Sequence, residues 1–85
     1  MELHYTSNQF MLNLLSQVQP LQANILETGH SAHLDADAFN DHISFDLTIF
    51  HDNAIVESFE FSALDSEEEL FAELQKLQAF IKNKL

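Results

Sequence analysis

This 85-residue sequence lacks arginine and cysteine entirely and contains one glycine and one proline. Without cysteine there is no disulfide framework, no thiolate zinc site and no cysteine nucleophile. With Gly29 as its single glycine, the chain offers no glycine-rich loop to cradle a phosphate group. No apolar run reaches the roughly 18 residues of a membrane span, and the first residues lack the pattern of a signal peptide. We therefore expect a single cytoplasmic domain, residues 1–85, that does not bind membranes.

The scarcity of positive charge is the most informative feature of the chain. The only basic residues, Lys76, Lys82 and Lys84, lie near the C-terminus, and the formal net charge is −11. Residues 35–73 contain twelve carboxylates and no lysine or arginine. Because most of these acids alternate with large apolar residues, the pattern predicts a folded acidic surface rather than a disordered tail. Such a surface attracts cationic partners and repels nucleic acid and anionic lipid.

The periodicity predicts an α+β fold, in which a small antiparallel sheet of two or three strands packs against an N-terminal and a C-terminal helix. The first helix is expected over about residues 7–18, after a capping box that begins at Thr6 and before the helix-breaking Pro20. The second is expected over about residues 66–83, after a capping box formed by Ser66 and Glu69. Its apolar stripe is Leu70, Leu74, Leu77 and Ile81.

Residues 21–41 give a weaker pattern. Leu21, Ala23 and Ile25 alternate with polar neighbours as in a strand. Leu21 and Ile25, with Gly29 behind them, equally fit a short helix and its cap. We favour a strand near residues 22–28. Residues 30–41 are expected to form a polar connection that contains at most a short strand or one helical turn.

A central β-hairpin is predicted over about residues 43–61, where apolar and polar residues alternate. A two-residue turn at 52–53 would place Phe45 opposite Glu60, whereas a three-residue loop at 51–53 pairs Phe45 with Phe59. We favour the three-residue loop, with Asn53 in the left-handed position. It leaves Glu57 opposite Leu47 on the apolar face, which predicts a peripheral carboxylate that reaches water. The outward side chains are then Ser44, Asp46, Thr48, Phe50, Val56, Ser58 and Glu60.

Catalytic and cofactor-binding motifs are absent, because no nucleophile has an evident base and no arginine can hold an anionic substrate. We therefore expect neither an enzyme nor a cofactor. The weak candidates for a metal site are His30, His33, Asp35 and Asp37, whose side chains suit zinc or nickel. Their spacing matches no known motif, so a solvated polar loop is the simpler interpretation.

The acids and one aromatic residue predict a partner-binding surface. Its expected members are Asp35, Asp37, Asp46, Phe50, Glu60, Glu67, Glu68, Glu69 and Glu73. In size, charge and lack of cysteine and catalytic motifs, the chain resembles phage-encoded anti-CRISPR and DNA-mimic proteins, although no motif places it in a named family. The resemblance implies a small inhibitor that blocks a basic surface of a nucleic-acid-binding protein and does not itself bind nucleic acid. The alternatives are an immunity protein that neutralises a nuclease toxin, and an assembly module or accessory subunit that acts as a homodimer.

Overall fold

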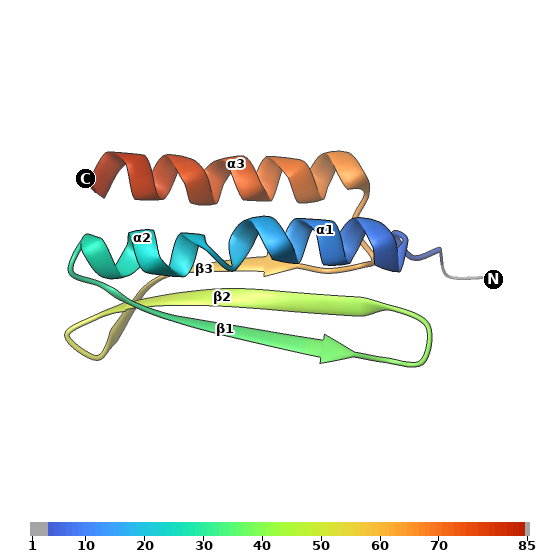
Figure 1. The fold of residues 1–85 in the computed structure, drawn as a ribbon, viewed down its shortest axis with the longest axis horizontal. Coiled ribbons are helices and arrows are strands. Elements are labelled where there is room, and N and C mark those ends of the chain that lie inside the picture. The colour runs from blue at the N-terminus through green and yellow to red at the C-terminus, as the bar shows by residue number, and fades with distance from the viewer. Residues whose placement is uncertain (1–3, 85) are drawn as a thin grey trace.

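The computed structural model describes residues 4–84. The expectation that the chain has no signal peptide rests partly on residues 1–3, which lie outside the described residues. The elements follow in the order α1 (Asn8–Val18), α2 (Leu21–Glu27), β1 (Ser31–Ala38), β2 (Ile43–His51), β3 (Ala54–Phe61) and α3 (Glu67–Lys84). The strands form one antiparallel sheet in the order β1-β2-β3. The helices lie on one face of this sheet, with α2 against β1, α1 against β2 and α3 against β3 (Figure 1). This arrangement confirms the predicted α+β fold.

The hydrophobic core lies between the helices and the sheet. Each of the six elements except β1 contributes fully buried or nearly buried side chains, and the rings of Phe45 and Phe61 stack with centroids 4.7 Å apart. Within residues 4–83 no charged or polar side chain is buried. The fully buried residues are Met11, Val18, Ile25, Leu47, Ile49, Phe61, Ala63, Leu70 and Leu77. Every acid that the structure describes therefore lies at the surface.

The start of α1 differs from the prediction. Its cap is Ser7, whose hydroxyl accepts a hydrogen bond from the Phe10 amide at 3.2 Å. Thr6 instead donates its amide to the Ala63 carbonyl at 2.8 Å and its hydroxyl to the Asp65 carbonyl at 2.7 Å. The capping box predicted at Thr6 is therefore wrong, because this residue ties the segment before α1 to the loop before α3.

The strand predicted near residues 22–28 is also wrong, because Leu21–Glu27 form α2. The first helix ends at Val18 as predicted, but Gln19 keeps helical angles, with φ −51° and ψ −50°. Pro20 is the cap residue directly before α2, with φ −64°. A proline suits the start of a helix, since its missing N–H would have no helical partner there. The same residue thus separates two helices instead of ending helical structure.

Gly29 closes α2 in the left-handed conformation, with φ 83°. Its amide donates to the Leu26 carbonyl at 3.0 Å, and the His30 amide donates to the Ile25 carbonyl at 3.3 Å. This pair of bonds is a Schellman motif, which uses carbonyls that the end of the helix would otherwise leave unpaired. The helical interpretation of Leu21, Ile25 and Gly29 was therefore the correct one of the two.

Residues 31–38 form the complete strand β1, where a polar connection with at most a short strand was predicted. Ala32 and Leu34 face the helices and are partly buried, whereas Asp35 and Asp37 lie on the other side and are exposed. The segment alternates with a period of two, but alanine and aspartate are uncommon in strands. Because these residues have a low strand propensity, the regular strand was not predicted.

The turn between β2 and β3 has two residues, so the predicted three-residue loop is wrong. Asp52 and Asn53 have φ of 52° and 67°, as in a type I′ turn, which confirms the left-handed Asn53. A β-bulge between Ile49 and Phe50 then shifts the pairing by one residue. The shift places Phe45 opposite Phe61, so a short turn and a continuous apolar face coexist.

The same bulge places Glu57 opposite Ile49 and not opposite Leu47. Its side chain is exposed, as the prediction of a peripheral carboxylate required, and accepts a hydrogen bond from the Ser58 amide at 3.1 Å. In α3 the predicted capping box is confirmed, because Ser66 and Glu69 exchange two side-chain-to-amide bonds of 3.1 Å each.

Candidate interface: the acidic outer face of the sheet

The sheet face turned away from the helices, here called the outer face, carries the alternate residues of all three strands. No helix covers it (Figure 1). Since side chains alternate along each strand, the buried positions Phe45, Leu47 and Ile49 force Asp46 and Thr48 of β2 to point outward. The cross-strand partners of those outward residues share the face. It comprises Ser31, His33, Asp35, Asp37, Ser44, Asp46, Thr48, Phe50, Ile55, Ser58 and Glu60.

Three carboxylates form a continuous row across this face. Asp46 is the register partner of Asp35 on one side and of Glu60 on the other. Like charges directly opposite one another on neighbouring strands repel. Burial raises the pKa of the Asp46 carboxyl above its ordinary value, and the charges of Asp35 and Glu60 raise it further, whereas His33 lowers it. We call Asp35, Asp46 and Glu60 the acidic row.

The negative surface continues from the acidic row around the free edge of β3. Glu60 lines two shallow hollows, one with Asp37 and Asp46 on the outer face and the other with Glu69 and Glu73 of α3. The Glu73 carboxylate accepts a hydrogen bond from the Glu60 amide at 3.3 Å, which fixes α3 to this edge. The sheet and helix acids therefore meet at Glu60.

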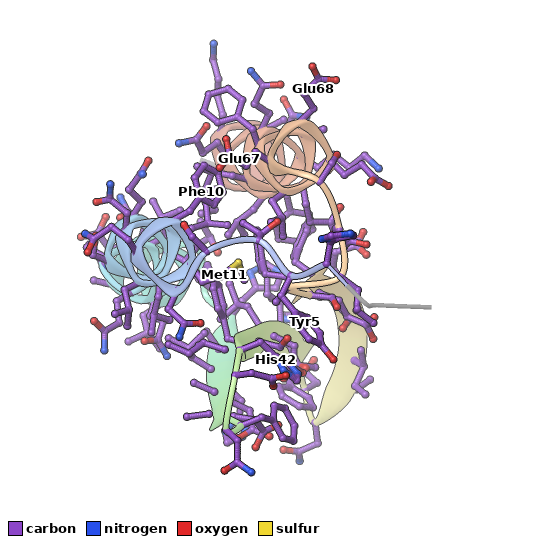
Figure 2. All side chains as sticks on the ribbon, turned by 90° about the vertical axis from the view of Figure 1, so that its right-hand side faces the viewer. Tyr5, Phe10, Met11, His42, Glu67 and Glu68 are labelled. Atoms are coloured by element: carbon purple, nitrogen blue, oxygen red, sulfur yellow. The ribbon has the colours of Figure 1, made fainter. Side chains whose placement is uncertain are left out.

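The first turn of α3 divides its acids between two sides of the molecule. Hydrogen bonds from the amide and hydroxyl of Ser66 lower the pKa of the Glu69 carboxyl, and Glu69 lies on the side of the β3 edge. Glu67 and Glu68 instead line an apolar hollow with Phe10 of α1 (Figure 2). The predicted surface is thus brought together except for Glu67 and Glu68.

The hairpin end of the outer face is apolar. Phe50 is half-buried, and its register partner Ile55 exposes 65% of its surface. Val56, beside the bulge, exposes 45%. An apolar group next to charged ones gives a partner area to bury once it has been attracted. The outer face therefore combines an acidic middle with an apolar end.

One lysine lies close to the Glu60 end of the acidic row. Lys76 on α3 lines the same hollow as Glu60 and Glu73, and its Nζ is 3.8 Å from the Glu73 carboxylate. Among the described side chains, no lysine forms an ion pair with the acidic row. The described part of the chain therefore supplies no direct ion pair to the row, and its nearby basic groups are Lys76 at the Glu60 end and His33 beside Asp46.

The four weak candidates for metal ligands are not brought together in the structure. His33, Asp35 and Asp37 share the outer face of β1, but His30 lies before the strand, where its Nδ1 is 2.8 Å from the Thr28 hydroxyl. Its ring packs against His51 with centroids 5.1 Å apart. Over residues 4–84 no group of three histidine or acidic side chains is arranged to hold a metal ion.

An aromatic stack at the other end of the sheet was not predicted from the sequence. The His42 ring stacks on Tyr5 at 4.1 Å and on Phe39 at 4.6 Å between centroids, and its Nδ1 lies 2.7 Å from the Asp41 carboxylate (Figure 2). The stack holds the segment before α1 against the turn between β1 and β2. Nothing in the spacing of Tyr5 and His42 along the chain indicates it.

Comparisons with protein-family models, curated proteins and solved structures give no match to this chain. None of the described helices is long and apolar enough to span a membrane.

The raised pKa of Asp46, which burial causes first and the charges of Asp35 and Glu60 increase, gives a first prediction. A carboxyl whose pKa is raised by folding binds its proton more tightly in the folded state, so its stabilising effect is lost as the pH rises through that pKa. Because solvent screens the charges of this partly exposed row, Asp46→Asn should stabilise the protein at neutral pH and low salt by no more than about 0.5 kcal/mol, a rise of roughly 2–4 °C in Tm. Thermal unfolding followed by circular dichroism measures the change.

The gain should shrink at high salt and vanish well below pH 3.8, the ordinary pKa of the carboxyl. Glu68→Gln is the control, because it removes the same charge from the favourable N-terminal end of α3 and should not stabilise. A Tm for Asp46→Asn equal to or below that of the wild type at neutral pH would show that the row stores no repulsion.

Proposed function

We propose that this protein is an acidic inhibitor, without catalytic activity, that binds and blocks the basic, nucleic-acid-binding surface of a partner protein in the cytoplasm. The observation that carries the proposal is the acidic row, Asp35, Asp46 and Glu60, held opposite the core, with which no lysine among the described side chains forms an ion pair. The three carboxylates of the row repel one another. A cationic partner that bound there would reduce this repulsion, which supports a role in binding such a partner.

The arrangement of the acids supports competition with nucleic acid. Neighbouring strands lie about 4.8 Å apart and alternate residues along a strand about 6.6 Å apart, so carboxylates recur in two directions over the outer face. Duplex DNA carries one charge per roughly 1.7 Å of axis, which a single strand cannot reproduce. Here three strands and the Glu69–Glu73 side of α3 contribute together. A basic groove built for phosphates would meet negative charge over a comparable area.

The two parts of the outer face have different roles in this mechanism. The acidic row acts over a distance, because complementary charge accelerates the encounter of two proteins. Phe50, with Ile55 and Val56, acts on contact, because buried apolar anchors slow dissociation. The proposed inhibitor thus blocks its target by occupying the site, with no chemical step.

An assembly module that acts as a homodimer is the second candidate, and one observation favours it. Phe71 on α3 exposes 52% of its surface and lines an apolar hollow with Phe10. Glu67 and Glu68 line the same hollow, so a second copy would bring four acids together there. The net charge of −11 likewise opposes self-association. We therefore favour the inhibitor.

Charge reversal tests the proposal. The partner is first captured from the native host on immobilised protein and identified by mass spectrometry. The double variant Asp46→Lys/Glu60→Lys should then associate with it at least about tenfold more slowly, with a weaker dependence on salt. The matched control is Glu67→Lys/Glu68→Lys, which changes the net charge equally on the other side of the molecule and should retain most of the association rate. Surface plasmon resonance measures both.

Equal association rates for the two double variants would show that the acidic row is not part of the interface. A captured partner that keeps its nucleic acid when saturated with this protein would equally reject the inhibitor.

Truncation of the apolar end tests the second role. Phe50→Ala should leave the association rate nearly unchanged and speed dissociation from the captured partner by about tenfold or more, as expected for a buried aromatic anchor. Phe71→Ala removes an equally large ring from a face outside the proposed interface and is the control. If both variants dissociate at the wild-type rate, the apolar end takes no part in binding.

A further inference from the structure

The two edge strands of the sheet, β1 and β3, differ in how their outward-pointing backbone groups are hydrogen-bonded. At the β3 edge, the amides of Ser58 and Glu60 point away from β2 and donate to the carboxylates of Glu57 and Glu73, at 3.1 Å and 3.3 Å. The bulge in β3 also interrupts regular pairing. Bulges and side chains of this kind prevent an edge strand from pairing with another chain. The protein therefore protects its β3 edge.

The β1 edge has no such protection. The bond from the Phe39 amide to the His42 carbonyl, 2.8 Å long, marks a hydrogen-bonded pair, and such pairs alternate along an antiparallel ladder. Asp35 and Asp37 accordingly bond to β2, while the amides of Leu34 and Ala36 point outward. Within residues 4–84, no hydrogen bond outside the ladder engages β1. β1 also has no proline, lysine or bulge over its 8 residues. It is a regular strand with one side open.

The side chains of β1 select what can pair there. On the outer face, Asp35 and Asp37 stand at alternate positions, next to Asp46. On the other face the strand carries only alanines and Leu34. A second copy added antiparallel would bring the aspartates of both copies together, which like-charge repulsion disfavours. An extended segment with lysine or arginine at alternate positions and apolar residues between them matches both faces.

We propose that an extended cationic segment of the partner adds to β1 as a fourth, antiparallel strand. This inference rests on the proposed function and specifies how the partner is held. Main-chain hydrogen bonds to the amides and carbonyls of Leu34 and Ala36 supply affinity, as in other cases of strand addition. The cationic side chains of the segment face Asp35 and Asp37 and select it over neutral or acidic strands.

The probe is the capped peptide Lys-Val-Lys-Val-Lys-Val-Lys-Val. In an antiparallel pair with its lysines beside the aspartates, the valine amides of the peptide point toward β1 and the lysine amides point away. Methylating the valine amides should weaken binding by more than about tenfold, since several hydrogen bonds are lost. Methylating the same number of lysine amides should change affinity little. Fluorescence anisotropy gives the affinities.

Hydrogen exchange measured by NMR gives an independent readout. In the free protein the Leu34 and Ala36 amides should exchange quickly, and bound peptide should slow both at least about tenfold. The variant Ala36→Pro, which removes one outward N–H and is tolerated at an edge, should lose affinity, whereas Ala36→Val should keep it. If the proline variant does not fold, the two methylated peptides decide the question.

Equal affinities of the two methylated peptides, or Leu34 and Ala36 amides that stay unprotected by bound peptide, would overturn strand addition. The proposed function survives that result if the captured partner still distinguishes the reversal of Asp46 and Glu60 from that of Glu67 and Glu68. If the partner does not distinguish them, the proposed function fails whatever the peptide does.

Discussion

The structure depends on the alternation of side chains along β2. Phe45, Leu47 and Ile49 are buried beneath the helices, so the intervening Asp46 must stand on the opposite side of the sheet. The register that joins Phe45 to Phe61 also places Asp46 beside Glu60, since neighbouring pairs in a ladder move together. The core thus holds like charges at directly opposite positions of neighbouring strands. A rotation or slip that separated them would expose the aromatic core.

This constraint connects stability with the proposed activity. The acids of the row repel one another, and the energy that opposes them comes from apolar burial on the reverse side of the same strands. Solvent screens these charges, so the repulsion costs at most a few tenths of a kcal/mol, which the modest stability of a small domain still registers. A cationic partner would remove the repulsion on binding, which adds to the attraction between the two surfaces.

The sequence predicted the parts of the fold that rest on large apolar residues. The stripe from Leu70 to Ile81 and the alternation of β2 were sufficient to place α3 and the outer face. Prediction from the sequence failed where two local signals of similar strength favoured different structures. Pro20 correctly marked the end of the first helix near Val18, but its second role as the cap of α2 was missed, and the alanines and aspartates of β1 have low strand propensity.

The candidate site shows the same division. The outward positions of Asp46 and Glu60 were predicted correctly, although the turn and the pairing from which they were derived were wrong. The bulge could not be predicted, since it reconciles a two-residue turn with the pairing of Phe45 and Phe61 through tertiary packing. Asp35 became a neighbour of Asp46 only through β1, so the row of three acids was visible only in the structure.

The central claim is that the fold holds the three like charges of the acidic row together on the outer face, which is the face proposed to bind a partner. An NMR titration of the Asp46 side-chain carboxyl carbon measures this directly, in the free protein and in its complex with a cationic partner. The account predicts that the pKa of Asp46 lies above its ordinary value in the free protein, as burial and the charges of Asp35 and Glu60 require, and falls when the partner is bound. A pKa at or below the ordinary value in the free protein, or one that the partner leaves unchanged, would contradict it.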